Sequence, residues 1–301
     1  MALFNVPFKA MGTLCQIRLM AESQSQAEHI AQPAISRIAD LENRYSRYIP
    51  SSLISRINAN AGAQLTPLDA ESHALFSYVA SAFEQSDGLF DVTSGVLRKA
   101  WNFRKVGPQS SLPARHSLPT QQQLDALLDC CGWAKVGWGG ERSIQLPAGF
   151  EIDFGGFVKE YAADSALSVL REKGVSSAMV DLGGDIAVFG GGWPIAIKKP
   201  RAPSEKLTQL SLRGGGLATS GNYERFFMLN NKRYSHILSP FTGWPIITPA
   251  SISVVADSCL VAGTVSTVAM LAGESDCLEY LDAFDLPYCC VFNDGRVVNQ
   301  F

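Results

Sequence analysis

The stretch from 151 to 185 constrains the fold of this chain more than any other. It reads EIDFGGFVKEYAADSALSVLREKGVSSAMVDLGGD. Residues 151–154 suit a short strand that ends at a Gly-Gly pair, and residues 177–182 suit a second strand that ends in the same way. Between them, from Lys159 onward, apolar residues recur at helical spacing, and Gly174 suits the left-handed position at which a helix stops. The pattern predicts a strand, a turn, a helix and a second strand.

The two Gly-Gly pairs, Gly155-Gly156 and Gly183-Gly184, each have an aspartate close by (Asp153 and Asp185). Glycine lets a ligand approach bare backbone N–H groups. The first pair also opens the helix, where N–H groups and the helix dipole favour an anion such as phosphate. One pair alone is more simply a tight turn, but two pairs around one helix favour a ligand site. Neither a Rossmann G-x-G-x-x-G pattern nor a P-loop pattern is present.

The composition of the chain excludes several classes of protein. Its 301 residues are 47% hydrophobic and 18% charged, as in an ordinary globular protein. The formal net charge of −3 lacks the basic surplus that nucleic-acid binding requires, and no apolar run is long enough to cross a bilayer. We therefore expect no nucleic-acid partner and no transmembrane segment. The sequence does not indicate an oligomeric state.

The cysteines and the N-terminus indicate a compartment. The chain has seven cysteines and no C-x-x-C pair, so buried thiols in a reducing compartment are favoured over disulfides or a zinc site. The N-terminus, MALFNVPFKAMGT, has neither the signal-peptide pattern nor a lipobox. The sequence as given predicts a cytoplasmic protein, and a periplasmic one if a leader was trimmed from it.

Hydrophobic periodicity and turn residues predict the remaining elements. We expect helices over 25–48, 52–58, 70–86, 121–128, 261–271 and 278–284. We expect strands over 6–20 (with a turn or bulge at 12–13), 193–198, 207–212, 216–220, 223–229, 251–256 and 288–292, and loops over 107–120 and 200–206. Because strands outnumber βαβ units, the fold class is α+β, with mixed or antiparallel sheets and packed helices. Residues 1–301 should form one domain, and a division into two lobes with the ligand site between them stays open.

Two further segments carry candidate site residues. Residues 88–103 combine large apolar side chains with Asp91, Thr93 and Trp101, which indicates the edge of the core or the wall of a pocket. Tyr48 ends a run of arginines and tyrosines, which is either a solvated surface or a cradle for a flat ring.

Among the four histidines, His236 stands at the junction of a strand and a Ser-Pro-Phe-Thr-Gly turn. Such a junction suits a functional side chain, and imidazole suits proton transfer near neutral pH. From the residues alone, a structural and a catalytic histidine are equally good interpretations. Thr219-Ser220-Gly221-Asn222 form a small polar turn after a strand, which suits phosphate oxygens, although such turns are common. A Ser-His-Asp triad is disfavoured because the chain lacks a G-x-S-x-G elbow.

Nine segments in order resemble the ApbE family, the FAD:protein FMN transferases, and they run from about residue 6 to the C-terminus. They are FKAMGT (8–13), SLISRIN (52–58), GLFDVTSGVLRKAWNF (88–103), DFGGFVKEYAAD (153–164), DLGGD (181–185), WPIAIKKP (193–200), ATSGNYER (218–225), YSHILSPFTGWP (234–245) and GTVSTVAMLAG (263–273). Any one of them is a weak signal, but the ordered set is a strong one.

The resemblance implies a fold, a reaction and a set of roles. The ApbE-like reaction cleaves the pyrophosphate of FAD, attaches FMN through its phosphate to a Thr or Ser hydroxyl of a flavoprotein acceptor, and releases AMP. FAD is then the expected substrate or ligand. The implied flavin or adenine slot is Met11, Tyr48, Asp91, Val92, Thr93 and Trp101; the implied phosphate site is Gly155, Gly156, Asp185, Thr219 and Ser220; the implied catalytic residues are Lys159, which adds positive charge, and His236, the base.

The resemblance also implies a divalent cation, usually Mg²⁺. The family holds it with the backbone carbonyl before the K-G lysine and with an Asp and a Thr spaced D-x-x-x-T, which places both side chains on one face of a helix. Here these positions are the carbonyl of Val158, Gly263 and Thr267. The chain therefore has glycine where the family has its aspartate, Glu160 where the family has glycine, and Ser239 where the family has Asp.

These departures leave two hypotheses. Hard cations prefer carboxylate oxygen, so a site of hydroxyls and carbonyls alone should bind Mg²⁺ weakly. The first hypothesis is an active FAD:protein FMN transferase with a rearranged metal site, in which Glu160 at the start of the helix is the candidate to reach the cation. The second is an FAD-binding relative that has lost the transfer and acts as a carrier or regulatory partner. A plain α+β hydrolase has no specific support.

Overall fold

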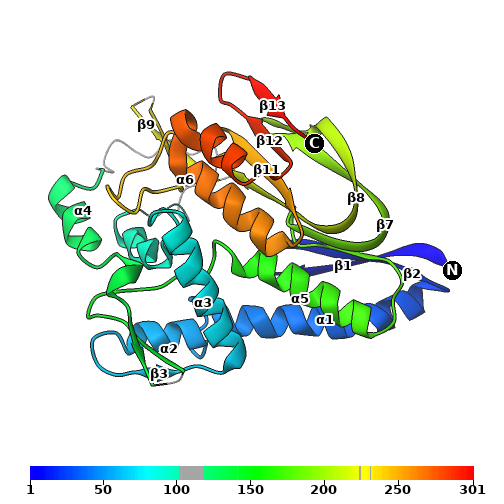
Figure 1. Cartoon of the computed structure of the whole chain (residues 1–301), viewed down its shortest axis with the longest axis horizontal. Coiled ribbons are helices and arrows are strands. Elements are labelled where there is room, and N and C mark those ends of the chain that lie inside the picture. Colours follow the sequence, from blue (N-terminus) through cyan, green and yellow to red (C-terminus); the bar gives the residue numbers. More distant parts are fainter. Residues whose placement is uncertain (102, 104–117, 141, 224, 231) are drawn as a thin grey trace.

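An antiparallel sheet of eight strands forms the centre of the fold (Figure 1). The structure is a computed structural model that describes residues 1–101, 103, 118–140, 142–223, 225–230 and 232–301. The strand order is β1-β2-β6-β7-β8-β11-β12-β13, and each neighbouring pair is antiparallel. The strands are β1 (Ala2–Ala10), β2 (Thr13–Ala21), β6 (Ala178–Asp181), β7 (Ile186–Lys199), β8 (Ala202–Gly221), β11 (Ser251–Ala256), β12 (Tyr288–Val291) and β13 (Val297–Asn299).

Helices α1 (Gln24–Tyr45), α5 (Val158–Glu172) and α6 (Cys259–Ala283) pack against this sheet and share its main hydrophobic core (Figure 1). Helices α1 and α5 are in contact, and both bury alanines; the fully buried ones are Ala27, Ala31, Ala34, Ala162, Ala163 and Ala166. Small side chains let two helices approach closely, so α5 is held firmly along its length. Its N-terminal end therefore has a fixed position relative to the sheet.

A second group of short elements lies beside α5 and α6 (Figure 1). It consists of α2 (Leu53–Ala59), α3 (Ala70–Gln85), the 3₁₀ helices η1 (Val92–Lys99) and η2 (Trp133–Lys135), α4 (Gln121–Leu128), the small sheet β3 (Thr66–Pro67), β5 (Ser143–Gln145) and β4 (Gly137–Gly139), and the hairpin of β9 (Phe226–Leu229) and β10 (Lys232–Ser235). Buried aromatic rings connect the group to the loop before α5. Phe76 on α3 lies 4.8 Å from Phe154, and Phe154 lies 4.5 Å from Phe157, between ring centroids.

Most of the predicted elements are confirmed to within a few residues. The helices predicted over 25–48, 52–58, 70–86 and 121–128 are α1, α2, α3 and α4, and the strands over 251–256 and 288–292 are β11 and β12. The helices predicted over 261–271 and 278–284 both lie in α6, which is interrupted at Gly273, where φ is 86°. Most of the predicted loop over 107–120 lies outside the described residues. The α+β class is confirmed, with antiparallel pairing throughout the large sheet.

Three predictions about strands were wrong in detail. Residues 151–154 do not form a strand, because their N–H groups find other acceptors: Ile152 donates to Asn58 Oδ1 at 2.8 Å, and Asp153 donates to the carbonyl of Val92 at 2.9 Å. Residues 6–20 form a hairpin rather than one interrupted strand, since Met11 and Gly12 turn the chain with φ of 52° and 72°.

The third error concerns residues 200–206, which were predicted to be a loop. Residues 202–206 instead belong to β8, which pairs with β7 as far as the partners Lys199 and Ala202. This part of the ribbon carries charged side chains, among them the Lys199–Glu205 ion pair at 2.7 Å. A two-stranded ribbon in solvent needs no buried face, so its sequence lacks the alternation that identifies a strand. In the described part of the chain, no helix combines the length and apolar character that crossing a membrane demands.

Candidate functional site

A cavity opens next to the N-terminal end of α5, where this helix approaches η1 and α6. Including the part that is open to solvent, the empty space of this cavity is about 500 Å³. Its lining includes Asp91 and Val92 at the start of η1, Gly156 before α5, and Thr267 on α6. Four residues that the sequence assigned to cofactor or metal therefore line one cavity.

The first Gly-Gly pair lies at the mouth of α5. The N–H of Gly155 donates to Asp153 Oδ1 at 3.0 Å, and the carboxylate of Asp153 also pairs with Arg47 at 3.1 Å. Gly156 is exposed, and no heavy atom of the described residues lies within 4 Å of the place where its Cβ would be. The N-cap residue of α5, Phe157, makes no side-chain hydrogen bond to the helix. The Gly-Gly pair therefore leaves room for an anion to approach the start of α5.

The second Gly-Gly pair lies against the β1–β2 turn. Gly183 and Gly184 have φ of 74° and 103°, which only glycine adopts readily. A Cβ on Gly183 would lie 2.7 Å from Thr13 Oγ1, so the glycine allows the two turns to touch. Met11, in the first of these turns, is half-buried, and its N–H donates to Glu42 Oε2 at 2.8 Å. This hydrogen bond holds the β1–β2 turn against α1, and Met11 is not among the residues that line the cavity.

Lys159, Asp185 and Thr219 come together between α5 and the sheet. The ammonium of Lys159 forms an ion pair with Asp185, whose carboxylate also accepts a hydrogen bond from the backbone of Thr219. Burial lowers the pKa of Lys159, but the charges of Asp185 and Glu160 outweigh it, and the pKa is raised. Burial raises the pKa of Asp185, and Lys159 opposes that rise. The lysine therefore keeps its positive charge at neutral pH.

A cluster of hydroxyl groups joins β8 to α6. Ser220 Oγ lies 2.9 Å from Ser266 Oγ and 3.2 Å from Thr267 Oγ1, and Thr219 Oγ1 lies 2.8 Å from Ser253 Oγ. The prediction of a turn at Thr219-Ser220 was wrong, because both residues lie in β8 and pair with β11. Since Thr267 lines the cavity, the Ser220 hydroxyl stands directly behind the predicted metal ligand. Hydroxyl oxygens of this kind can donate to phosphate or ligate a hard cation.

Glu160 occupies the space beside Gly263. A Cβ built on Gly263 would lie 2.5 Å from Glu160 Cγ and 3.0 Å from its Oε1. The glutamate is only 8% exposed. Burial, followed by the negative charge of Asp185, raises the pKa of Glu160 to about 8, although Lys159 opposes the rise. Within the described ranges, no three His, Cys, Asp or Glu side chains form a metal-binding group.

Several predicted site residues turn their polar groups away from the cavity. Thr93 is fully buried: its hydroxyl donates to Asp91 at 2.6 Å and accepts from the N–H of Gly132 at 2.8 Å. Trp101 is 3% exposed and packs among Phe227, Tyr234 and Trp244, and its indole N–H donates to the carbonyl of Gly243 at 2.8 Å. Both shape the segment that carries Asp91 and Val92.

Tyr48 and His236 lie near loops. Tyr48 is 52% exposed, and the guanidinium of Arg47 lies 5.4 Å from its ring centroid. The imidazole of His236 lies 3.1 Å, through Nδ1, from the carbonyl of Arg225, and it meets the Phe103 ring edge-on at 6.5 Å. Burial, and then the charge of Arg225, lowers the pKa of His236 to about 4. The ring is therefore neutral at pH 7.

Sequence reasoning missed Gly95, which lines the cavity beside the Arg47–Asp153 ion pair. A Cβ at Gly95 would lie 2.8 Å from both Arg47 Nη1 and Asp153 Cβ, and the Arg47 guanidinium donates to the Gly95 carbonyl at 3.1 Å. The glycine allows this ion pair to brace η1 against the loop before α5. The available signal was a lone glycine inside a helical turn, which is disfavoured unless close packing requires it.

The order of these turns and helices along the chain also identifies its relatives. The sequence model of the ApbE family matches residues 11–290. The chain belongs to the ApbE family. This match covers the Met11 turn, both Gly-Gly pairs and the 263–267 segment of α6, so the elements around the cavity are those of the ApbE family.

Named ApbE-family relatives cover most of this chain. A protein of Treponema pallidum (strain Nichols) named FAD:protein FMN transferase is 29% identical over an alignment of 311 positions. The alignment covers 95% of this chain and 84% of that protein. A protein of the same name from Klebsiella pneumoniae (strain 342) is 30% identical over 243 residues, 78% of this chain and 72% of that protein.

Solved structures agree with this assignment. The flavinyl transferase ApbE of Pseudomonas stutzeri, in its apo form, has a TM-score of 0.84 at 25% identity, over 98% of this chain and 93% of that one. The ApbE protein of Thermotoga maritima has a TM-score of 0.87 at 24% identity, over 99% of this chain and 97% of that one. At that identity the second likeness shows the ApbE fold alone.

Proposed function

We propose that this chain is an FAD:protein FMN transferase, which moves FMN from FAD to a Thr or Ser hydroxyl of a flavoprotein acceptor and releases AMP. The observation that carries the proposal is a set of groups around the N-terminal end of α5. Gly156 and Thr267 line the cavity, Lys159 stands in the first turn of α5, and the Ser220 hydroxyl lies 3.2 Å from Thr267 Oγ1. These groups suit a pyrophosphate, whose charge increases on the leaving side during transfer.

Each predicted residue has a place in this proposal. Gly155 and Gly156 let the pyrophosphate approach the start of α5, and Lys159, fixed by Asp185, neutralises part of its charge. Thr219 and Ser220, at the end of β8, would face the phosphates from the side of the sheet. The flavin or adenine rings would lie along Asp91 and Val92, which line the cavity, and extend toward Met11 and Tyr48, with Thr93 and Trp101 supporting that wall from behind.

The transfer step requires one bond to form and one to break. The acceptor oxygen bonds to the phosphorus of the FMN half, and the bond from this phosphorus to the oxygen shared with AMP breaks. AMP leaves with that oxygen, and the hydroxyl proton passes to a base. His236 is the candidate base, because its lowered pKa keeps the imidazole unprotonated at neutral pH.

The family also implies Mg²⁺, and the residues present fit a hard cation. Thr267 and the carbonyl of Val158 offer neutral oxygen ligands, and the buried Oε2 of Glu160 has no hydrogen-bond partner within the described parts of the chain. When bound, Mg²⁺ would neutralise the negative charge of the pyrophosphate. The residues of this chain would supply the oxygen ligands and hold them in place.

The test is transfer itself. Purified protein is incubated with FAD, MgCl₂ and a Thr-containing flavoprotein domain that an ApbE-family transferase modifies; mass spectrometry then looks for FMN on the acceptor, and chromatography for AMP. We expect both products, and neither with an acceptor whose target Thr is replaced by Val. FAD binding by calorimetry without either product would instead support the non-catalytic carrier or regulatory partner, which the names of the relatives do not favour.

A further inference from the structure

We infer that Glu160 supplies, from α5, the carboxylate ligand that α6 lacks at Gly263, so that the divalent-cation site keeps its negative charge although its carboxylate has moved to the neighbouring helix. The inference deepens the proposed function and rests on it for the identity of the cation's partner, FAD. It concerns the residues of this chain that would bind the cation, since Gly263 stands where the ApbE family has its aspartate ligand.

The first observation is where Glu160 lies. A Cβ on Gly263 would lie 2.5 Å from Glu160 Cγ, closer than real Cβ atoms approach. The stem of the glutamate therefore fills the volume into which a side chain at position 263 would extend. The glycine at 263 on α6 and the glutamate at 160 on α5 therefore complement each other: the side chain that α6 lacks is replaced by one from the facing helix.

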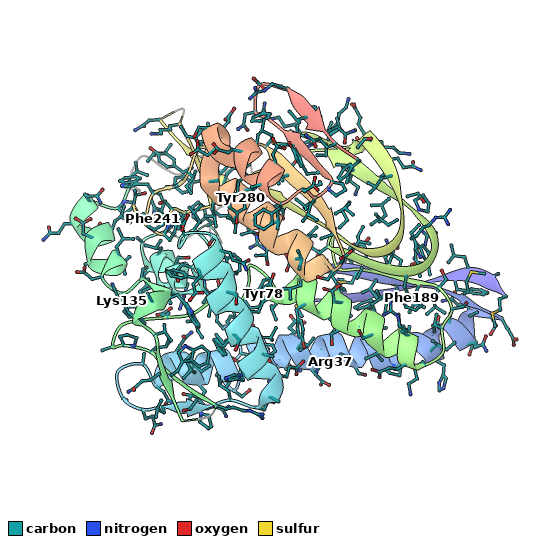
Figure 2. All side chains as sticks on the ribbon, viewed as in Figure 1. Arg37, Tyr78, Lys135, Phe189, Phe241 and Tyr280 are labelled. Carbon is teal, nitrogen blue, oxygen red and sulfur yellow. The ribbon has the colours of Figure 1, made fainter. Side chains whose placement is uncertain are left out.

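The second observation is the direction of the carboxylate. Glu160 Oε1 is 3.0 Å from the place of the missing Cβ, and Gly263 lies one helical turn before Thr267, on the same face of α6. The carboxylate thus reaches the face that presents the Thr267 hydroxyl. Tyr78 on α3 holds this part of α6 in place, because its hydroxyl donates to Thr264 Oγ1 at 2.7 Å. Figure 2 shows Tyr78 where α3 and α6 meet.

The third observation is an unsatisfied oxygen. Glu160 is more than nine-tenths buried, at 8% exposure, and its Oε2 has no hydrogen-bond partner in the part of the chain that the structure describes. A buried polar atom without a partner is costly, by about 1–3 kcal/mol or more for a charged group, and a side chain that only filled space could be apolar. A bound cation would satisfy this oxygen.

The surrounding charges also suit a cation. The charged groups that act on Glu160 include the Lys159–Asp185 ion pair and the carboxylate of Asp164. Asp164 already accepts hydrogen bonds from the N–H groups of Cys259 and Leu260, at 2.9 Å each. Lys159 is held by Asp185. This leaves Glu160 as the carboxylate with a free oxygen among these groups, and oxygen ligands are those that Mg²⁺ and Mn²⁺ prefer.

The experiment measures cation binding directly, independent of catalysis. Mn²⁺ is titrated into wild-type protein with and without FAD, and the EPR signal of free Mn²⁺ gives the bound fraction. Glu160→Gln keeps the shape of the side chain and removes its charge, and we expect it to weaken Mn²⁺ binding by about tenfold or more. Glu172→Gln, an exposed carboxylate at the other end of α5, is the matched control and should bind as wild type does.

The exchange between helices makes a second, sharper comparison. Gly263→Asp alone should not strengthen Mn²⁺ binding, because the new side chain collides with Glu160. The double variant Glu160→Gly/Gly263→Asp returns the carboxylate to α6 and should recover the Mn²⁺ affinity that Glu160→Gly loses. In crystals of wild-type protein soaked with Mn²⁺ and FAD, the anomalous peak should lie roughly 2–2.5 Å from a Glu160 carboxylate oxygen.

The outcomes separate this inference from the proposed function. Mn²⁺ binding that depends on Glu160 supports the inference even if no FMN is transferred. Equal Mn²⁺ affinity in wild type and Glu160→Gln, or a wild type that binds no Mn²⁺ with FAD present, overturns it even if transfer occurs. Should Glu160→Gln fail to fold, the anomalous peak in wild-type crystals decides: a peak away from Glu160 overturns the inference.

Discussion

Lys159 and Asp185 form an ion pair that joins the first turn of α5 to the turn after β6. The two residues come from the two Gly-Gly segments of the chain, so this pair fixes the spacing of both turns. Asp185 is almost fully buried, whereas about a third of the lysine side chain is exposed. The pair therefore determines where the positive charge of Lys159 stands relative to the cavity.

Breaking this pair should lower the stability of the protein. Asp185→Asn leaves a mostly buried ammonium without its counter-charge, and we expect it to lower the free energy of unfolding by about 2–3 kcal/mol, less than for a fully buried pair because Lys159 is partly exposed. Lys159→Met/Asp185→Asn should cost less than the sum of the single variants. Urea denaturation without FAD measures the unfolding free energies of the wild type, the two single variants and the double variant. Additive effects of the single variants would contradict the prediction that the pair is coupled. The control is Glu205→Gln, at the exposed pair with Lys199, which should leave the urea midpoint unchanged.

Gly156→Val should weaken FAD binding without harming the fold. No heavy atom of the described residues lies within 4 Å of a Cβ at Gly156, and the residue is exposed at the cavity. The added side chain therefore contacts none of the described residues closely, but it stands where we propose that the pyrophosphate approaches α5. We expect at least about a tenfold loss of FAD affinity by calorimetry.

Gly214→Val is the control for that substitution. Gly214 likewise has no heavy atom of the described chain within 4 Å of its Cβ position, and it lies in β8, outside the cavity lining. It should keep the FAD affinity of the wild type. If Gly156→Val binds FAD as tightly as Gly214→Val does, the phosphates do not lie against this turn.

The sequence could predict the elements around the site because they are governed by local rules. Apolar spacing located α5 and α6, and the glycines located the turns, since only glycine readily adopts the left-handed φ of 74° and 103° at Gly183 and Gly184. Residues 151–154 were mispredicted because their hydrogen-bond partners, Asn58 and Val92, are far away in the sequence. Such pairing leaves no periodic signal.

The contacts within the site were harder to predict for the same reason. The missing carboxylate at Gly263 was visible in the sequence, but the insertion of Glu160 into that space depends on how α5 and α6 pack. The inward orientation of Thr93 depends on Gly132, which is 39 residues away. Sequence patterns located the segments of the site, whereas tertiary packing decided which side chains face the cavity.

Gly263→Ala tests the packing between Glu160 and α6 through stability. In the wild-type background the new Cβ would lie 2.5 Å from Glu160 Cγ, and we expect overpacking to cost about 1–3 kcal/mol. In a Glu160→Ala background that atom is absent, and the same change should gain up to about 1 kcal/mol because alanine favours a helix over glycine. Chemical denaturation of the four proteins measures the sign change. A loss of equal size in both backgrounds would show that Glu160 does not occupy this space.

The pH dependence of stability should reveal the neutral state of His236. Burial lowers its pKa to about 4, whereas an unfolded histidine titrates near 6.5. Between these values the unfolded state binds more protons, so this contribution to stability is full above pH 6.5 and is lost as the pH falls toward 4. We expect the free energy of unfolding to fall by roughly 2 kcal/mol over this range. This is less than the difference between the two pKa values would give, because the side chain is only half-buried. Urea denaturation from pH 4 to 7 should show this loss in the wild type but not in His236→Gln. The control is His29→Gln, at an exposed histidine on α1, which should show the same loss as the wild type. Identical pH profiles for all three proteins would place the His236 imidazole in solvent.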